Sequence, residues 1–370
     1  MISFHITGKD PASGARLGRL ETGRGLVQTP VFMPVGTAAT VKATRPEVLE
    51  SMGANLILGN TYHLYLRPGI QIMRSLGGLH RFMAWPAGIL TDSGGYQVFS
   101  HRALNRISEE GVEFASHLDG SRHFFSPERS IEVQRILGSD IVMAFDDCTP
   151  YPVSHSEAQA SMRLSMRWAE RSKQAMEGST QALFGIVQGS VFADLRRESL
   201  ARLLETGFDG IAMGGFSVGE PKLLMHELLE QIRDALPPEV PHYLMGVGTP
   251  LDIVRAVLNG YDMFDCVLPT RNARNGMLFT WKGPIRIKNA RFSDDPRPLD
   301  EECGCPTCRR FSRAYLRHLY ISGEILSSVL NTHHNLYFYL ELMQRIRSEI
   351  PSGGLVGLAR ELEIRYGADA

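Results

Sequence analysis

The chain has 370 residues, of which 43% are hydrophobic and 21% are charged, a balance typical of a globular protein with a large core and not of a disordered chain. No apolar run approaches the roughly 18 residues of a membrane helix, and the first residues, MISFHITGKD, lack the charged-then-apolar order of a secretion signal. We therefore expect a cytoplasmic protein. The net charge of −1 argues against binding of a polyanion over the whole surface.

Short apolar runs, each followed by a helical pattern, recur along the chain. They are VFMPVG (31–36), NLILGN (55–60), GILTDSG (88–94), IVMAFDD (141–147), LFGIVQG (183–189), GIAMGG (210–215), HYLMGVG (242–248) and MFDCVLP (263–269). Helix signals lie between them, such as the Ser and Pro that open SPERSIEVQRILG. Eight strand–helix alternations predict an α/β fold, a (β/α)8 TIM barrel, and argue against an open doubly wound sheet.

Two regions depart from this alternation. Residues 99–125 form an insertion after the third strand, and the Asp-Gly pair in VEFASHLDGSRHFF predicts a β-hairpin. After the eighth strand, residues 277–335 hold clustered basic residues and cysteines, and NLYFYLELMQRIRSEI predicts an amphipathic helix that packs back on the barrel. We therefore expect a barrel over residues 1–276, a cysteine-rich basic subdomain over 277–335 and C-terminal helices over 336–370.

Polar residues that close the apolar runs are candidates for an active site, because the active sites of such barrels lie at the carboxyl ends of the strands. These residues are Asp92, Asp146, Gln188, Gly214, Gly215 and Asp265. Each of them alone could be a strand-terminal cap. Together, carboxylates and an amide suit recognition of a planar, donor-rich heterocycle such as a purine, with Tyr96 or Met245 as apolar walls. A carboxylate can also attack an anomeric carbon while a second carboxyl group acts as acid and base.

The cysteines indicate a metal site. Cys303, Cys305 and Cys308 lie within six residues of one another, and His333 and His334 follow downstream. Such crowding in a chain without a secretion signal is typical of metal binding. Three thiolates and one imidazole would complete a tetrahedral zinc shell with no open position, so we expect one structural Zn²⁺ ion per chain.

Basic residues gather in two acid-free stretches near these cysteines. Six lie between Cys266 and Arg291, and four lie between Cys303 and Tyr320. A charge run is often only a solvated face, but two runs beside a metal site and a barrel mouth suggest a clamp for a phosphate backbone. The candidates for this role are Arg271, Arg274, Arg309, Arg310 and Arg313.

The chain closely resembles the bacterial tRNA-guanine transglycosylase family, whose members are also called queuine tRNA-ribosyltransferases. The resemblance lies in TDSGGYQVFS, HLDGSRHFFSPERS, GSDIVMAFDDCTPYP, GIVQGS, HYLMGVGTP, MFDCVLPTRNARNG and CGCPTCRRFSRAYLRHL, which follow the family's order over nearly the whole chain. It implies an exchange of bases in queuosine biosynthesis. In the exchange that the resemblance implies, guanine at the wobble position of a tRNA anticodon would be replaced by 7-aminomethyl-7-deazaguanine without ATP. The resemblance also suggests a homodimer.

The same resemblance implies roles for individual residues. Asp265 would be the nucleophile, and Asp92 the general acid/base that also contacts the base. Asp146, Gln188 and Gly215 match base-reading positions, with Tyr96 and Met245 on the two faces of the ring. Cys303, Cys305, Cys308 and His334 match the zinc ligands, which favours His334 over His333.

Two residues bear on the choice of base. Val218 resembles the bacterial form of the family. Phe216 stands where leucine is common, and if only its backbone carbonyl meets the aminomethyl group, this difference is harmless.

Two other functions fit part of the pattern. A retaining glycosidase on the same barrel would share paired carboxylates, but sugar sites usually present several aromatic platforms, and the chain has only three tryptophans. A non-catalytic tRNA-binding subunit would be expected to lack the aspartates, whereas Asp92 and Asp265 are both present.

Overall fold

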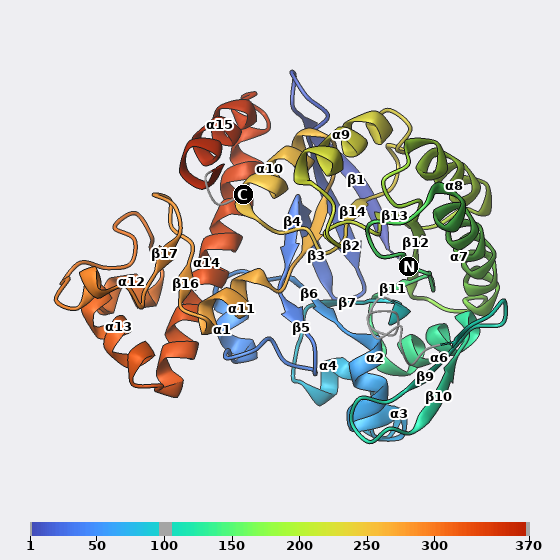
Figure 1. Cartoon of the computed structure of the whole chain (residues 1–370), viewed down its shortest axis with the longest axis horizontal. Coiled ribbons are helices and arrows are strands. Elements are labelled where there is room, and N and C mark those ends of the chain that lie inside the picture. Colours follow the sequence, from blue (N-terminus) through green and yellow to red (C-terminus); the bar gives the residue numbers. More distant parts are fainter. Residues whose placement is uncertain (1, 96–105, 368–370) are drawn as a thin grey trace.

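The computed structural model describes residues 2–95 and 106–367. Within these ranges no helix is long and apolar enough to cross a membrane. At its centre is a parallel sheet with the strand order β4-β15-β14-β13-β12-β11-β7-β6-β5 (Figure 1). Its strands are β4 (Val31–Met33), β5 (Val35–Gly36), β6 (Leu56–Gly59), β7 (Gly88–Thr91), β11 (Ile141–Met143), β12 (Ala182–Val187), β13 (Gly210–Met213), β14 (His242–Leu244) and β15 (Met263–Asp265).

The sheet closes on itself through its first strand. β4 pairs with β15 and β5 pairs with β6, and only Pro34 separates β4 from β5. Pro34 has no N–H group, but its carbonyl accepts a hydrogen bond of 3.0 Å from the N–H of Leu58, so the ladder continues across it. The eight predicted strands are therefore present, the first in two parts, and the predicted (β/α)8 barrel is confirmed.

An antiparallel sheet that the sequence analysis did not identify covers one end of the barrel. It consists of β1 (Ser3–Lys9), β2 (Arg16–Thr22) and β3 (Gly25–Thr29). Leu20 and Val27 from this sheet pack into the apolar cluster inside the barrel, together with residues such as Met143 and Phe184. Arg16 also binds both carboxylate oxygens of Asp262, at 3.0 and 2.6 Å, just before β15 begins. The amino-terminal end of the barrel is thus closed, and the opposite rim remains for a site.

Helices surround the barrel (Figure 1). They are α1 (Pro46–Ser51), α2 (Thr61–Leu64), the π-helical turn η1 (Tyr65–Gly69), α3 (Ile70–Ser75), α4 (Leu79–Phe82), α6 (Pro127–Leu137), α7 (His155–Ala175), α8 (Ala193–Thr206), α9 (Lys222–Arg233), α10 (Pro250–Leu258) and α11 (Leu268–Arg274). The signals read from SPERSIEVQRILG act as predicted in α6. Ser126 accepts a hydrogen bond from the N–H of Arg129, and Gly138 ends the helix with a φ of 70°.

The predicted hairpin of the insertion is confirmed. β9 (Val112–Ala115) and β10 (Arg122–Phe125) pair antiparallel, and β8 (Arg106–Ile107) adds a third strand. The turn holds the Asp-Gly pair but is longer than a two-residue turn. Its ends are joined by hydrogen bonds from Ser116 N–H to the Ser121 carbonyl, at 2.8 Å, and from Gly120 N–H to the Ser116 carbonyl, at 2.9 Å.

The C-terminal region stands beside the barrel and is joined to it by one long helix (Figure 1). Its elements are β16 (Met277–Leu278), β17 (Ile285–Arg286), the 3₁₀ turn η3 (Ala290–Phe292), α12 (Pro306–Arg310), α13 (Arg313–Ile321), α14 (Ile325–Glu349) and α15 (Leu355–Tyr366). In α14, Leu330 packs into the core of the cysteine-rich region, whereas Phe338 and Leu342 pack into the core shared with the barrel helices. α14 therefore runs through residue 335 without a break and connects the two cores.

Candidate active site and metal centre

The strand ends bring most of the predicted site residues to one rim of the barrel. Asp92, Gln188 and Gly214 follow directly after β7, β12 and β13, and Asp265 is the last residue of β15. Asp146 lies in the loop that follows β11. Because these strands are parallel and successive in the sheet, their carboxyl ends face the same side. This is the end opposite the covering sheet.

Asp92 is held by the residues that open α2. The side-chain amide of Asn60 donates to one carboxylate oxygen at 2.5 Å, and the backbone N–H of Thr61 donates to the other at 2.7 Å. The Thr61 hydroxyl donates to the backbone carbonyl of Asp92 at 2.5 Å. These bonds fix both the backbone and the carboxylate of Asp92. Only 7% of the surface of this residue is exposed.

Asp146 accepts hydrogen bonds from two neutral side chains. Ser93 donates to one oxygen at 2.8 Å, and Gln188 donates to the other through Nε2 at 2.7 Å. Burial is the main cause that raises the pKa of Asp146 to about 6. The hydrogen bonds from Ser93 and Gln188 lower this pKa, and the charges of Asp147 and Asp92 raise it. The Gln188 amide nitrogen carries a second hydrogen that can serve a ligand carbonyl.

Gly214 and Gly215 lie against the side chain of Gln188. A Cβ atom at Gly214 would lie 2.7 Å from Gln188 Nε2, and one at Gly215 would lie 2.7 Å from Gln188 Oε1. Gly215 also has a φ of 69°, which L side chains rarely adopt. Glycine is therefore required at both positions if the Gln188 amide is to lie beside the backbone.

Asp265 receives two hydrogen bonds at one oxygen. The Tyr243 hydroxyl donates to Oδ1 at 2.6 Å, and the Gly246 N–H donates to it at 2.8 Å. Among the described residues Oδ2 accepts no hydrogen bond, so this oxygen is left for a ligand. Burial raises the pKa of Asp265, and its two donors lower it. Burial is the main cause that raises the pKa of Tyr243, and the charges of Asp265 and Asp92 raise it further.

Of the two residues expected to form the walls of the pocket, the structure describes only one. Met245 follows β14 and is half-buried at the rim, whereas Tyr96 lies outside the described residues. The Phe216 ring is buried and lies 3.7 Å above the guanidinium carbon of Arg196. Val218 lies in a turn in which Glu220 accepts hydrogen bonds from the N–H groups of Ser217 and Val218, at 2.6 and 3.0 Å.

Several residues that hold the site were missed by the sequence analysis. They are Asn60, Thr61, Ser93, Tyr243, Gly246 and Arg196. Asn60 could have been found, because it closes the run NLILGN in the same way as Asp92 closes the next one. Ser93 lies inside a motif that was selected only for Asp92. Tyr243 and Arg196 carry no such signal, because a strand interior and an amphipathic helix ordinarily contain residues of these types.

The cysteines and His334 form the predicted metal-binding group. Their ligand atoms all lie within 4.8 Å of one another, and all four residues are buried. His334 donates from Nε2 to the carbonyl of Phe279 at 2.7 Å, which leaves Nδ1 facing the sulfur atoms at 3.3–3.7 Å. Three sulfurs and one fixed ring nitrogen fit a closed tetrahedral zinc shell.

The five candidate arginines differ in their surroundings. Arg271 and Arg274 are exposed on α11, directly after Asp265, and Arg309 and Arg310 are exposed at the end of α12. Arg313 is half-buried and is engaged within the subdomain.

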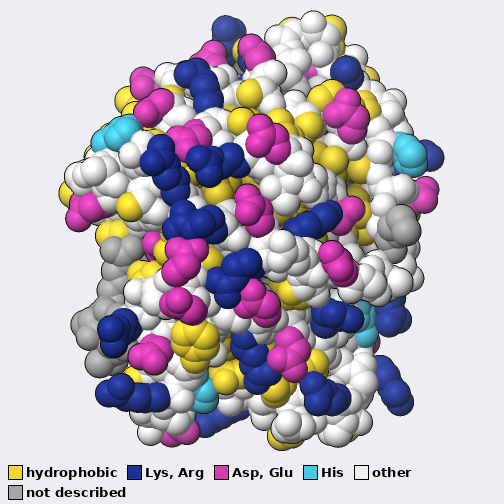
Figure 2. Space-filling model, turned by 90° about the vertical axis from the view of Figure 1, so that its right-hand side faces the viewer, with side chains coloured by type: hydrophobic (Ala, Val, Ile, Leu, Met, Phe, Trp, Pro, Cys, Tyr) yellow, Lys and Arg dark blue, Asp and Glu magenta, His cyan; other side chains and the backbone are white. Residues whose placement is uncertain are grey.

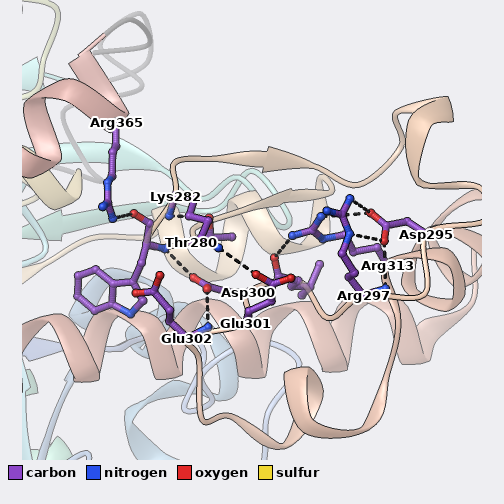
Figure 3. Close-up of polar contacts among 11 residues, drawn as sticks. Thr280, Lys282, Asp295, Arg297, Asp300, Glu301, Glu302, Arg313 and Arg365 are labelled. Atoms are coloured by element: carbon purple, nitrogen blue, oxygen red, sulfur yellow. Dashed lines mark hydrogen bonds and ion pairs between the residues drawn. The ribbon is translucent and has the colours of Figure 1, made fainter.

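Arg313 binds Asp295 at 3.2 Å and the carbonyl of Leu299 at 2.9 Å (Figure 3). Arg297 binds the same aspartate. The stretch around Arg313 is thus free of acids in the sequence but not in space, and the expectation of acid-free surroundings is wrong for this residue.

The opposite flank of the molecule has mixed charge. Figure 2 shows the face on the side of α7 and α8, on which basic and acidic side chains alternate. Several of them form ion pairs, including Arg163 with Glu198 and Arg167 with Glu109. No excess of one sign marks this face as a surface for a polyanion.

The chain is similar to known proteins of one family. A model of the family described as "Queuine tRNA-ribosyltransferase" matches residues 10–368. Queuine tRNA-ribosyltransferases of Syntrophobacter fumaroxidans and Zymomonas mobilis are 59% and 57% identical over 349 and 370 residues, covering 94% and 99% of this chain and 94% and 95% of the relatives. That of Caldanaerobacter subterraneus is 55% identical over 366 residues, covering 99% of this chain and 98% of the relative. This chain belongs to the queuine tRNA-ribosyltransferase family.

Proposed function

We propose that this protein is a tRNA-guanine transglycosylase that exchanges the wobble guanine of a tRNA anticodon for 7-aminomethyl-7-deazaguanine. The observation that carries the proposal is the carboxylate of Asp265, which within residues 2–95 and 106–367 is oriented through Oδ1 alone and keeps Oδ2 for an electrophile. A second carboxylate, Asp92, lies on the same rim. The names of the relatives support the same class of reaction.

The exchange needs two displacements at the anomeric carbon. Asp265 forms an ester bond to this carbon as the bond to guanine breaks, and Asp92 gives a proton to the departing base. Asp92 then takes a proton from the incoming base, whose ring nitrogen attacks the anomeric carbon and releases Asp265. Asp146, Gln188 and the N–H of Gly215 would read the edge of either base, with Tyr96 and Met245 on its faces and the Phe216 backbone beside its substituent.

One measurement distinguishes a transglycosylase from a glycosidase and from a non-catalytic tRNA-binding subunit. Only a transglycosylase incorporates labelled guanine into tRNA. Asp265 and Asp92 are both held for chemistry by several hydrogen bonds, which disfavours the non-catalytic subunit.

The nucleophile can be tested by trapping the covalent intermediate. Asp265→Asn keeps the side-chain shape but replaces the carboxylate with a poor nucleophile, so exchange should fall by several orders of magnitude while tRNA still binds. Wild-type enzyme denatured after reaction with tRNA and the base should show a band shifted by tRNA, which the Asn variant lacks. An adduct that persists in Asp265→Asn and disappears in Asp92→Asn would reverse the two roles.

The role of Asp146 predicts a pH dependence of base binding. The carboxylate must be ionised to accept hydrogen bonds from a base, and the pKa of Asp146 in the free protein is about 6. Affinity for the base should therefore be full above this pH and fall about tenfold per unit below it. Calorimetric titration from pH 5 to 8 measures this, with Asp146→Asn as the control that should lose the dependence. A wild-type affinity that does not change over this range would remove Asp146 from the pocket.

We propose that the Cys303, Cys305, Cys308 and His334 group holds a structural Zn²⁺ ion. The ion would join the loop of α12 to α14 and would leave no position for a catalytic water, because four protein ligands complete the shell.

Cys305→Ser should therefore release the metal and lower the midpoint of thermal unfolding. A loss of several kcal/mol shifts the midpoint of a chain of this size by about 2 °C per kcal/mol. Elemental analysis and calorimetry measure the two effects, and Cys148→Ser, at a buried cysteine outside the group, should retain the metal. A metal-free protein of full thermal stability would contradict the structural role.

We propose that the exposed arginines contact the tRNA backbone. Arg271 and Arg274 lie on the helix that follows Asp265, and Arg309 and Arg310 lie beside the metal-binding group. Arg313 was expected to share this role. Because it binds Asp295, we propose only that it supports the segment that carries the others.

Replacing Arg309 and Arg310 with Ala should raise the KM for tRNA and reduce the salt dependence of tRNA binding by about one unit of slope per lost contact. The KM for the free base should not change. Arg163→Ala, on the mixed-charge face, is the matched control. An equal rise in both KM values would indicate that the two arginines support the fold instead.

We also propose a homodimer in the cytoplasm. Exposed apolar residues occur on α13 and α14, namely Tyr315, Ile321, Ile325 and Leu326, and 82% of Ile325 is exposed. A second copy of the chain is the occupant that the family resemblance suggests for such a surface.

A further inference from the structure

A buried arginine lies behind the glycines of the proposed base pocket. Arg196 on α8 is 0% exposed, and no carboxylate among the described residues forms an ion pair with it. Its Nε donates to the carbonyl of Ser190 at 2.6 Å, and its Nη2 donates to the carbonyls of Gly214 and Gly215 at 3.0 and 3.5 Å. The guanidinium group is thus dedicated to the backbone of the loops after β12 and β13.

Burial of the Arg196 charge costs desolvation free energy, and contacts around the guanidinium group offset part of this cost. Burial lowers the pKa of Arg196 to about 10, so the group is still a cation at neutral pH. Backbone carbonyls accept from it on one side, and the Phe216 ring covers it with its centre 3.7 Å from the guanidinium carbon. An apolar residue would fill this space without the cost of a buried charge, so a specific use for the donors is expected.

The direction of the Gly214 carbonyl decides the direction of the next N–H group. In a trans peptide the carbonyl of one residue and the N–H of the next point to opposite sides. Because Arg196 binds the Gly214 carbonyl from behind, the Gly215 N–H points away from Arg196. Among the described residues this N–H donates to no acceptor, and the Gln188 amide lies beside Gly215.

The surrounding residues hold α8 close enough for this contact. A Cβ atom at Gly189 would lie 2.9 Å from the backbone nitrogen of Arg196, so glycine permits the approach. One turn further along α8, Ser199 accepts a hydrogen bond of 3.1 Å from the N–H of Gln188. The same helix therefore supports both the glycine pair and the base-reading glutamine.

We propose that Arg196 is a positioning residue that fixes the Gly214–Gly215 peptide and thereby makes the pocket select bases with a carbonyl at the edge that Gly215 reads. This inference rests on the proposed function. It assigns the choice between carbonyl and amino substituents to a side chain that does not touch the base.

The test compares two bases that differ at this group. Guanine carries a ring carbonyl, and 2,6-diaminopurine carries an amino group in its place. Equilibrium binding of both is measured for the full-length wild-type enzyme and for Arg196→Met, which keeps the length of the side chain but has no donor.

Arg196→Met should lose about five- to tenfold in affinity for guanine, the effect of one hydrogen bond that is no longer aligned. Its affinity for 2,6-diaminopurine should stay the same or improve, and the KM for tRNA should not change.

Two further variants separate positioning from packing. Arg347→Met is the control, because Arg347 is a half-buried arginine that also donates to a backbone carbonyl, that of Pro30 at 2.7 Å, at the closed end of the barrel. Its preference for guanine should equal that of wild type. Arg196→Gln covers the case that the Met variant does not fold. It should lose at least about threefold of the preference, because one amide nitrogen on a shorter side chain replaces the two guanidinium nitrogens, Nε and Nη2, that donate to the carbonyls of Ser190 and Gly214.

The possible results distinguish a failure of the positioning role from a failure of the proposed function. An equal loss for both bases in a folded Arg196→Met variant would mean that Arg196 only packs the core, and unchanged preference in the Met or Gln variant would also overturn the proposal. A wild-type enzyme that binds neither base and incorporates no labelled guanine would overturn the proposed function, and this inference with it. A wild-type enzyme that prefers guanine, with variants that keep this preference, would overturn the positioning role alone.

Discussion

Carboxylates held by neutral hydrogen-bond donors are the feature on which the rest of this site depends. Asp265 is oriented by a tyrosine hydroxyl and a backbone N–H, and Asp146 by a serine and a glutamine. Among the described residues neither carboxylate forms an ion pair. At Asp265, a cation at this distance would stabilise the charge and weaken the attack proposed for this residue, whereas neutral donors fix the geometry of both carboxylates without an ion pair. The antiparallel sheet closes the amino-terminal end of the barrel, so these carboxylates and their donors lie at the opposite rim, which stays open.

The metal-binding region and the helix that follows Asp265 are joined through neighbouring residues of α14. His334 donates to the Phe279 carbonyl, and Asn335 accepts from the N–H of the same residue at 3.0 Å. Asn335 also donates to the carbonyls of Pro269 and Met277, at 3.0 and 3.1 Å. Pro269 lies in α11, the helix that begins just after Asp265. A metal ion bound at His334 would therefore stabilise α11, which begins just after Asp265 and carries two of the exposed arginines.

The sequence predicted those features that short stretches encode. Alternating strands and helices, the polar residue that ends each strand and the spacing of the cysteines are local patterns, and they identified the barrel, Asp92 and Asp265 as candidates and the metal-binding group. Contacts between distant segments were not predictable in this way. The ion pair of Arg16 with Asp262 spans most of the chain, and Asp295 reaches Arg313 only after the loop between them folds back. The choice of His334 over His333 as the fourth metal ligand came from the resemblance to the family and not from the spacing of the residues.

The least predictable residues are those that act from behind the rim. On α6, Gln134 bonds both the N–H and the carbonyl of Met143, and Ser130 donates to the carbonyl of Ser93. On α8, Ser199 and Arg196 bond the backbone beside Gln188 and Gly214. In the sequence these side chains are ordinary polar members of amphipathic helices. Only packing shows that they face inward, where an unpaired polar group is costly and each must serve a backbone group near the strand ends. Helices outside the barrel thus determine the geometry of the loops that form the candidate site.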